Sequence, residues 1–193
     1  MRLAFIGGPG VGKTTLVNIL TQELGLPLLG ERARIVARAW GTTPAEIPPH
    51  RMLEFQWELL HQQMEAEADY PRGFIADRCV IDIVAHTLIF ADDAGIPKPE
   101  VARFIEAASR RLSHYDLIVF VPPMFPMVVD GERIADTSYQ RALDQLLSDL
   151  VVSLDQYHCP GLAGRVHTIK SLSIADRLAE IKDAINQRMA VTA

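Results

Sequence analysis

The chain has 193 residues, of which 49% are hydrophobic and 22% are charged, and its formal net charge is -5 at pH 7. This composition is typical of a globular protein with a buried core, and the acidic balance argues against a general nucleic-acid-binding surface while leaving local basic patches open. Two separated cysteines, no signal-peptide pattern and no apolar run of about 20 residues indicate a reduced, cytoplasmic protein without a membrane-spanning segment. We expect one domain over residues 1–193.

Short apolar runs alternate with helical patterns along the chain. The predicted strands are Leu3–Ile6, Leu26–Leu29, Gly73–Ala76, Leu117–Val121 and Val166–Ile169. Helices are predicted where apolar residues recur at helical spacing, namely through Val17, Leu20 and Leu24, through Met52, Phe55, Leu59 and Met64, twice between 77 and 114 with a break at Gly95-Ile96-Pro97, and over about 137–157 and 174–189. This alternation predicts an α/β fold with a parallel sheet and helices on both faces.

The segment GGPGVGKTT, residues 7–15, directly follows the first predicted strand. It matches the P-loop pattern G-x-x-x-x-G-K-[ST] between a strand and a helix, which disfavours the alternative of an ordinary glycine-rich turn. Glycines allow backbone N–H groups to converge on an anion, and the start of the helix adds its positive end. Lys13 would reach the β- and γ-phosphates of ATP, and the Thr14 hydroxyl would bind Mg²⁺. The predicted ATP-binding residues are Gly7, Gly8, Pro9, Gly10, Val11, Gly12, Lys13, Thr14 and Thr15.

Ligands of an open parallel sheet bind at the carboxyl ends of its strands, and charged residues follow two further strands there. Asp77 closes the third strand, as does the acid that supports Mg²⁺ in P-loop enzymes, although a helix N-cap is the alternative. Arg78 is expected beside the phosphates or the acceptor, with a surface salt bridge as its alternative.

Glu31 follows the second strand, where a carboxylate facing the γ-phosphate would orient an acceptor hydroxyl and accept its proton. An acid that merely favours a helix N-terminus is the alternative. Arg34 lies one helical turn further on and is expected either to pair with Glu31 or to bind an anionic substrate.

The irregular, proline-rich segment PPMFPMVVDGERIADTSYQR carries Arg133 and Arg141. We expect a lid over about 123–141 that closes on ATP and brings positive charge to the transferring phosphoryl group. An ordinary surface loop is the alternative, and the sequence leaves open which of the two arginines acts.

These motifs together resemble the P-loop kinase-like ATPases related to the nicotinamide riboside kinase domain and, more distantly, the thymidylate and deoxyribonucleoside kinases. The matching pieces span most of the chain in the order of the family: GGPGVGKTTL, ERAR, FQWELLHQQ, IADRCVIDIVAH, YDLIVFVPP and DGERIADTSYQR. Cys79, after the Asp-Arg pair, and His86, near a position that is often aromatic, depart from the family pattern.

The resemblance implies a three-layer P-loop NTPase fold with a five-stranded parallel sheet in the order 2-3-1-4-5, and ATP and Mg²⁺ as cofactors. It implies an acceptor held between the long second helix and the Asp77-Arg78 pair, with Glu31 near the acceptor and Arg133 in the lid. Gln56, on the long helix, would present its amide to the edge of a base. A solvent-exposed helix position is the alternative for Gln56.

The sequence favours a kinase that transfers the γ-phosphate of ATP to a hydroxyl of a small nucleoside or nucleotide-type acceptor. A regulatory NTPase is an alternative, disfavoured because the GTP-specific N-K-x-D motif is absent. A kinase for a hydroxymethylated base within DNA is another, for which two sets of arginines would supply positive charge: Arg32, Arg34 and Arg38, and Arg103, Arg110 and Arg111. The sequence leaves a homodimer open.

Overall fold

The computed structural model describes residues 1–124 and 137–192, with the side chains of 137, 191 and 192 not described. Its strands are β1 (Arg2–Ile6), β2 (Leu28–Leu29), β3 (Phe74–Asp77), β4 (Leu117–Phe120) and β5 (Val166–Thr168). They form one parallel sheet in the order β2-β3-β1-β4-β5, as the family resemblance implied.

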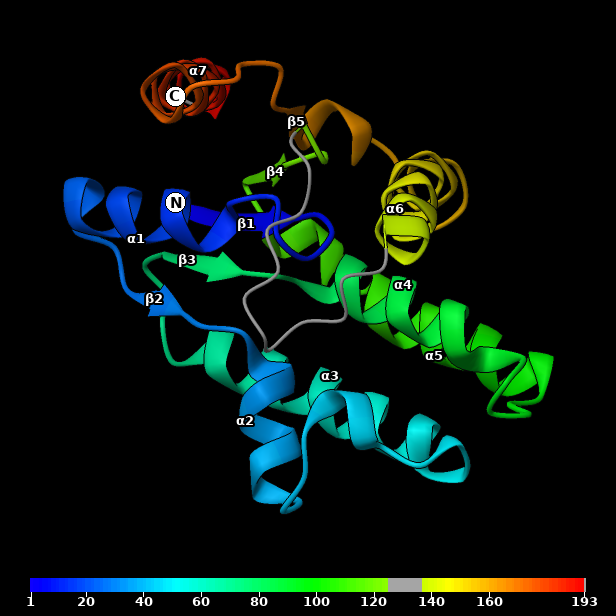
Figure 1. Ribbon diagram of the computed structural model, residues 1–193. Helices are drawn as coiled ribbons and strands as arrows, with labels where there is room; N and C mark the ends of the chain where they lie inside the picture. The colour runs from blue at the N-terminus through cyan, green and yellow to red at the C-terminus, as the bar shows by residue number, and fades with distance from the viewer. Residues whose placement is uncertain (125–136, 193) are drawn as a thin grey trace.

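Helices connect the strands and cover the sheet (Figure 1). They are α1 (Lys13–Leu24), α2 (Arg32–Ala39), α3 (Met52–Ala68), α4 (Val80–Ala91), α5 (Lys98–Ser109), α6 (Thr137–Tyr157) and α7 (Ile174–Thr192). The short 3₁₀ turns are η1 (Pro44–Glu46), η2 (Pro49–Arg51), η3 (Leu112–His114) and η4 (Ala163–Arg165). Within the described residues, no helix is long and apolar enough to cross a membrane.

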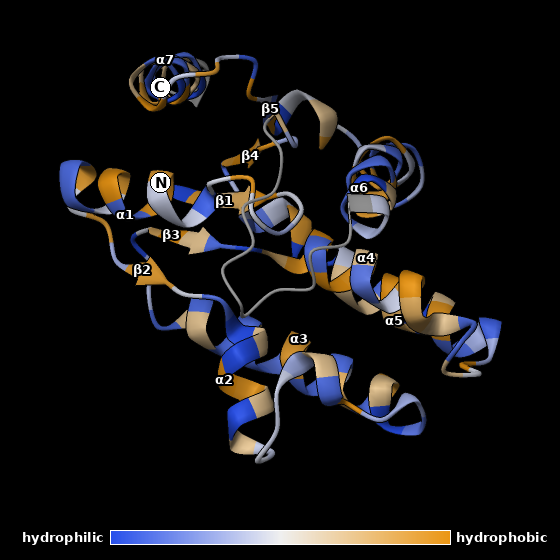
Figure 2. Cartoon of the chain, in the orientation of Figure 1, coloured by the Kyte–Doolittle hydropathy of each residue, from blue (hydrophilic) through white to orange (hydrophobic). Residues whose placement is uncertain are grey.

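The side chains of β1 alternate between two separate cores, as the period of a strand requires. Leu3 and Phe5 pack with residues of α1 and α7, whereas Ala4 and Ile6 pack with residues of α2, α3, α4 and α6. Hydrophobic colours dominate β2, β3 and β4 in Figure 2, because strands with both faces covered need apolar residues throughout. The predicted three layers of helices, sheet and helices are therefore confirmed.

The predicted strands and helices agree with the structure in number and order, and β2 shows the largest difference in length. Strand β2 has two residues instead of four, and it lies at the edge of the sheet, where Leu28 is 40% exposed. A short edge strand limits unwanted pairing with another chain. The apolar run that predicted the strand therefore includes residues that only approach the sheet.

The carboxyl ends of β1 and β4 fix the start of the P-loop. Ile6 pairs with Phe120, and Gly7 then turns with a φ of 142°. A Cβ atom on Gly7 would lie 2.4 Å from the carbonyl oxygen of Val121. The loop can leave the sheet at this point only because residue 7 has no side chain.

We expect Gly7→Ala to lower the free energy of unfolding by about 2–4 kcal/mol, because it combines a disfavoured φ with a backbone clash. Urea denaturation followed by circular dichroism measures this. Gly164→Ala is the matched control, since a Cβ atom there meets nothing within 4 Å, and its effect should stay within about 0.5 kcal/mol. Equal midpoints and slopes for the two variants would contradict the steric argument.

Candidate active site

A cavity of about 840 Å³ opens where β1, β2 and β3 end. The P-loop residues 9–15 form one side of it, and the other sides come from α2 and the turn after it, the end of β3, α4 and α6. The remaining lining residues are Glu31, Arg34, Arg38, Thr42, Thr43, Pro44, Ala45, Asp77, Arg78, His86, Phe90 and Tyr139. The cavity is in the size range of small-molecule sites and lies where ligands of open α/β sheets bind.

Lys13 is buried at the P-loop end of the cavity. Its Nζ donates hydrogen bonds to the carbonyl oxygens of Gly7 at 2.7 Å and Gly8 at 2.6 Å. Burial, reinforced by the positive charge of Arg78, lowers the pKa of Lys13 to about 7, although nearby carboxylates act in the opposite direction. An anion bound at this end would favour the charged form of the amine.

Thr14, in the first turn of α1, and Asp77, at the end of β3, meet beside Lys13. The Thr14 hydroxyl donates a hydrogen bond to Oδ2 of Asp77 at 2.7 Å. Hydroxyl and carboxylate oxygens are ligands that Mg²⁺ prefers, and P-loop sites take few protein ligands, so this pair fits the metal that the family implies. In the described part of the chain, no group of three or more His, Cys, Asp or Glu residues offers another metal site.

Arg78 joins three parts of the site. Its Nε donates to Glu31 at 2.9 Å, and its Nη1 donates to Asp82 at 3.1 Å and to the carbonyl oxygen of Gly7 at 3.5 Å. Its backbone has a φ of 87°, which residues with a Cβ seldom adopt. The Arg78 side chain is 17% exposed and lines the cavity, where it forms ion pairs with Glu31 and Asp82.

Glu31 is the residue before α2 and forms two ion pairs, one with Arg78 and one with Nε of Arg34 at 3.2 Å. Burial alone would raise the pKa of Glu31, but the charges of Arg78, Arg34 and Lys13 together hold it below its usual value. Glu31 is therefore a carboxylate at neutral pH. Its side chain makes no capping hydrogen bond to α2.

Asp82, which the sequence analysis missed, is buried on α4 behind Arg78. It accepts hydrogen bonds from the backbone N–H of Cys79 at 3.1 Å and from Arg78. Burial raises the pKa of Asp82, against the effect of Arg78 and Lys13. Its position three residues after Cys79, the N-cap of α4, is a capping-box signal that could have identified it.

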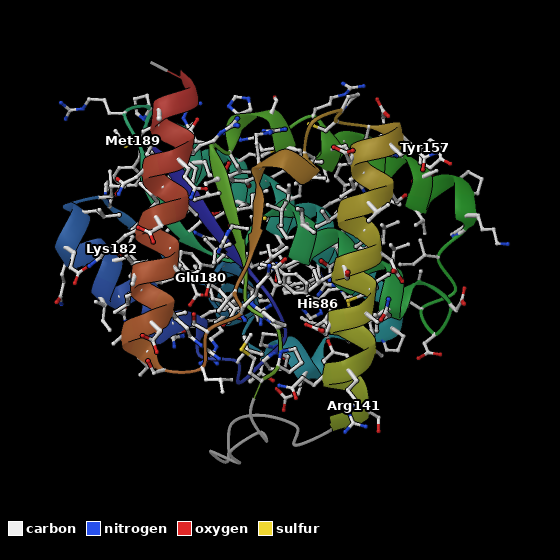
Figure 3. The ribbon with its side chains drawn as sticks, turned by 90° about the horizontal axis from the view of Figure 1, so that it is seen from above. His86, Arg141, Tyr157, Glu180, Lys182 and Met189 are labelled. Atoms are coloured by element: carbon white, nitrogen blue, oxygen red, sulfur yellow. The ribbon has the colours of Figure 1, made fainter. Side chains whose placement is uncertain are left out.

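Ring-bearing side chains of α4 and α6 also line the cavity. The ring of His86 stacks on Phe90 with centroids 6.4 Å apart, and its Nδ1 lies 3.0 Å from the hydroxyl of Tyr139. Figure 3 shows His86 within the body of the protein, between α6 and α7 in that view. His86 thus packs, as one histidine on an apolar helix usually does, and also faces the cavity.

Four predicted site residues do not line this cavity in the described structure, namely Gly7, Gly8, Gln56 and Arg141. Gln56 is 3% exposed, with its Nε2 3.5 Å from the sulfur of Met52, and its Oε1 has no hydrogen-bond partner among the described residues. Arg141 is exposed near the start of α6 (Figure 3). Arg133 and most of the expected lid lie outside the described residues. The roles of these residues stay predictions.

Comparison with known proteins identifies the family. The model of the AAA domain matches residues 2–163. Adenylate kinase of Thermosynechococcus vestitus is 31% identical over 159 residues, which cover 77% of this chain and 71% of that protein. The Holliday junction branch migration complex subunit RuvB of Acholeplasma laidlawii is 26% identical, covering 77% of this chain and 55% of that protein.

Solved structures share the fold. A NadR protein in complex with NR has a TM-score of 0.72 at 19% identity, and the match covers 97% of this chain but 51% of NadR. Deoxyadenosine kinase from M. mycoides has a TM-score of 0.67 at 12% identity, covering 97% and 100% of the two chains. Thymidylate kinase from Ehrlichia chaffeensis has a TM-score of 0.62 at 15% identity, covering 96% and 98%. The chain belongs to the AAA-domain family of P-loop proteins and has the fold of the nucleoside and nucleotide kinases.

Proposed function

We propose that this protein transfers the γ-phosphate of ATP, with Mg²⁺, to a hydroxyl group of a small nucleoside or nucleotide-type acceptor. One observation carries the proposal: the ionised carboxylate of Glu31 and the P-loop amine of Lys13 line the same cavity. Arg78 connects them, since it contacts both Glu31 and the carbonyl oxygen of Gly7. A donor site and a group for the acceptor hydroxyl are thus held next to each other.

Each residue has a chemical task in this reaction. Lys13 and the P-loop N–H groups bind the phosphates, and Thr14 and Asp77 would hold Mg²⁺, which neutralises charge on the phosphate oxygens. Glu31 orients the acceptor hydroxyl and takes its proton as the hydroxyl oxygen bonds to the phosphoryl group and ADP leaves. Because its pKa is lowered, Glu31 is a weak base, and it accepts the proton late in the transfer.

Arg78 is proposed to stabilise the charge of the transferring group, because its guanidinium lies at the junction of donor and acceptor positions. Arg133 and Arg141 remain the proposed lid arginines, and Gln56 remains a proposed acceptor contact. Both cysteines are free, which supports the proposal of a reducing, cytoplasmic setting.

A free small acceptor is favoured over DNA by the positions of the arginines. Arg111 forms an ion pair with the buried Glu67 at 2.6 Å, so its charge is balanced by a carboxylate of the protein interior. Arg103 and Arg110, on or just after α5, do not line the cavity. The two sets of arginines therefore do not surround one site in the described structure.

Transfer of labelled γ-phosphate from Mg-ATP tests the function directly. Acceptors would be nucleosides, nucleoside monophosphates, nicotinamide riboside, and DNA with and without hydroxymethylated bases. We expect label on a small acceptor and none with Lys13→Ala, whose fold is checked by circular dichroism. Release of free phosphate at the same rate with and without each acceptor would instead favour a regulatory NTPase.

We expect Glu31→Gln to slow the chemical step about 10²- to 10⁴-fold while ATP affinity changes little, because the variant removes the proton acceptor but keeps the side-chain shape. Single-turnover kinetics with saturating acceptor measure this step. Glu54→Gln, at an acid paired with Arg51 on the exposed side of α3, should match the wild type. An unchanged single-turnover rate in Glu31→Gln would reduce Glu31 to a structural role.

The ring of His86 is expected to stay uncharged, because burial and the charges of Arg78 and Lys13 lower its pKa to about 3. The unfolded chain binds a proton at its ordinary histidine pKa, so this group stabilises the fold fully above that value and progressively less as pH falls toward 3. When the pH falls from 7 to 5, the free energy of unfolding of the wild type should therefore drop. The drop in His86→Phe should be smaller by about 1–2 kcal/mol.

Urea denaturation at the two pH values measures this difference. His50→Phe, at an exposed position in η2, should keep the wild-type pH profile. Identical profiles for His86→Phe and the wild type would mean that His86 titrates normally in the folded protein.

A further inference from the structure

The cavity is lined by more positively charged side chains than the P-loop lysine that is expected to bind the phosphates of ATP. Four described lysine or arginine residues line it: Lys13, Arg34, Arg38 and Arg78. Lys13 is bonded to the P-loop, Arg78 is paired with Glu31 and Asp82, and Arg34 is paired with Glu31. Three of the four cations thus have protein partners, and they lie at the end of the cavity where phosphoryl transfer is proposed.

Arg38 differs from the other three cations. It lies one turn beyond Arg34 on α2 and is exposed to solvent. Its guanidinium forms no ion pair or hydrogen bond with any residue in 1–124 or 137–192. It nevertheless lines the cavity, so within the described part of the chain its charge faces the cavity without a protein partner.

The surroundings of Arg38 favour an anion over a neutral group. The carboxylates that line the cavity, Glu31 and Asp77, are both at the P-loop end and already have partners. Beyond Arg38 the described lining consists of uncharged residues 42–45. Glu46, the acid of the η1 turn, accepts hydrogen bonds from the hydroxyls of Thr42 and Thr43 and does not line the cavity.

We propose that the phosphoryl acceptor already carries a phosphate group, which Arg38 binds at the far end of the cavity from the P-loop. This inference rests on the proposed kinase function and narrows its substrate class to nucleosides that bear a phosphate away from the reacting hydroxyl. An arginine fork suits this task because it can contact two phosphate oxygens at once.

The spacing along α2 agrees with such a molecule. From Glu31 to Arg38 the helix rises about 10 Å, at about 1.5 Å per residue. One end of the acceptor would present its hydroxyl to Glu31, and the other would present its phosphate to Arg38. The uncharged rings of His86 and Phe90 also line the cavity and suit contact with an uncharged base between the two ends.

The test compares binding of matched ligands by isothermal titration calorimetry, with the protein saturated by Mg²⁺ and a non-hydrolysable ATP analogue. The probes are the common deoxynucleosides and their 3′-monophosphates, which keep the 5′-hydroxyl free. We expect at least one monophosphate to bind the wild type 10-fold or more tightly than its nucleoside. Raising the salt concentration should weaken binding of the monophosphate more than that of the nucleoside.

Arg38→Gln should reduce this preference to within 2-fold without changing affinity for the ATP analogue, and Arg38→Lys should keep part of it. Arg110→Gln, at an exposed arginine outside the cavity, should bind as the wild type does. A preference that survives in Arg38→Gln, or no preference in the wild type, would overturn the proposal. Tighter, Arg38-dependent binding of a single-stranded oligonucleotide would overturn it in favour of a DNA acceptor.

Label transfer with the same probes separates this inference from the proposed function. Arg38-dependent binding of a monophosphate without transfer to any probe would refute the kinase function and keep the phosphate site. Transfer to nucleosides and monophosphates with equal efficiency, unaffected by Arg38→Gln, would keep the kinase function and refute the phosphate site.

Discussion

The guanidinium of Arg78 is the contact on which the rest of the site depends. It holds the end of β3 against the start of α2 through Glu31, against α4 through Asp82 and against the P-loop through Gly7. The positive φ of this residue costs of order 1–3 kcal/mol, which the surrounding contacts must offset. One of them is the backbone hydrogen bond from Arg78 to Phe5, 3.0 Å long, which ties the strained residue to the central strand. Donor and acceptor ends of the cavity therefore share one rigid junction.

The P-loop is also held from the C-terminal part of the chain. Nε2 of Gln140, on α6, donates to the carbonyl oxygen of Pro9 at 2.7 Å. Arg177, buried on α7, donates from Nη1 to the carbonyl oxygen of Val11 at 3.2 Å and from Nε to Ser171 at 2.9 Å. These contacts occupy carbonyl oxygens of the loop, so that its N–H groups remain the polar groups available to an anion.

Sequence reasoning identified what local patterns determine. The P-loop, the strands and the acids at strand ends all follow from short segments whose chemistry does not depend on distant residues. Gln140 and Arg177 could not be identified in this way, since they meet the P-loop across 131 and 166 residues of sequence. Gln56 illustrates the opposite case, because helical spacing cannot tell whether a polar residue on a partly buried helix faces a cavity or its neighbouring turn. The short β2 shows that an apolar run predicts a strand better than it predicts its ends.

The burial of Lys13 has a consequence for proton balance. An amine with a pKa of about 7 is partly uncharged in slightly alkaline solution, whereas an amine that contacts bound phosphate is charged. If the loop binds ATP as proposed, each binding event at such a pH takes up a fraction of a proton from solvent. The heat of binding then depends on the ionisation enthalpy of the buffer, and nucleotide affinity falls as the solution becomes more alkaline. The amine of Lys13 would thus both bind the phosphates of the nucleotide and make nucleotide affinity depend on pH.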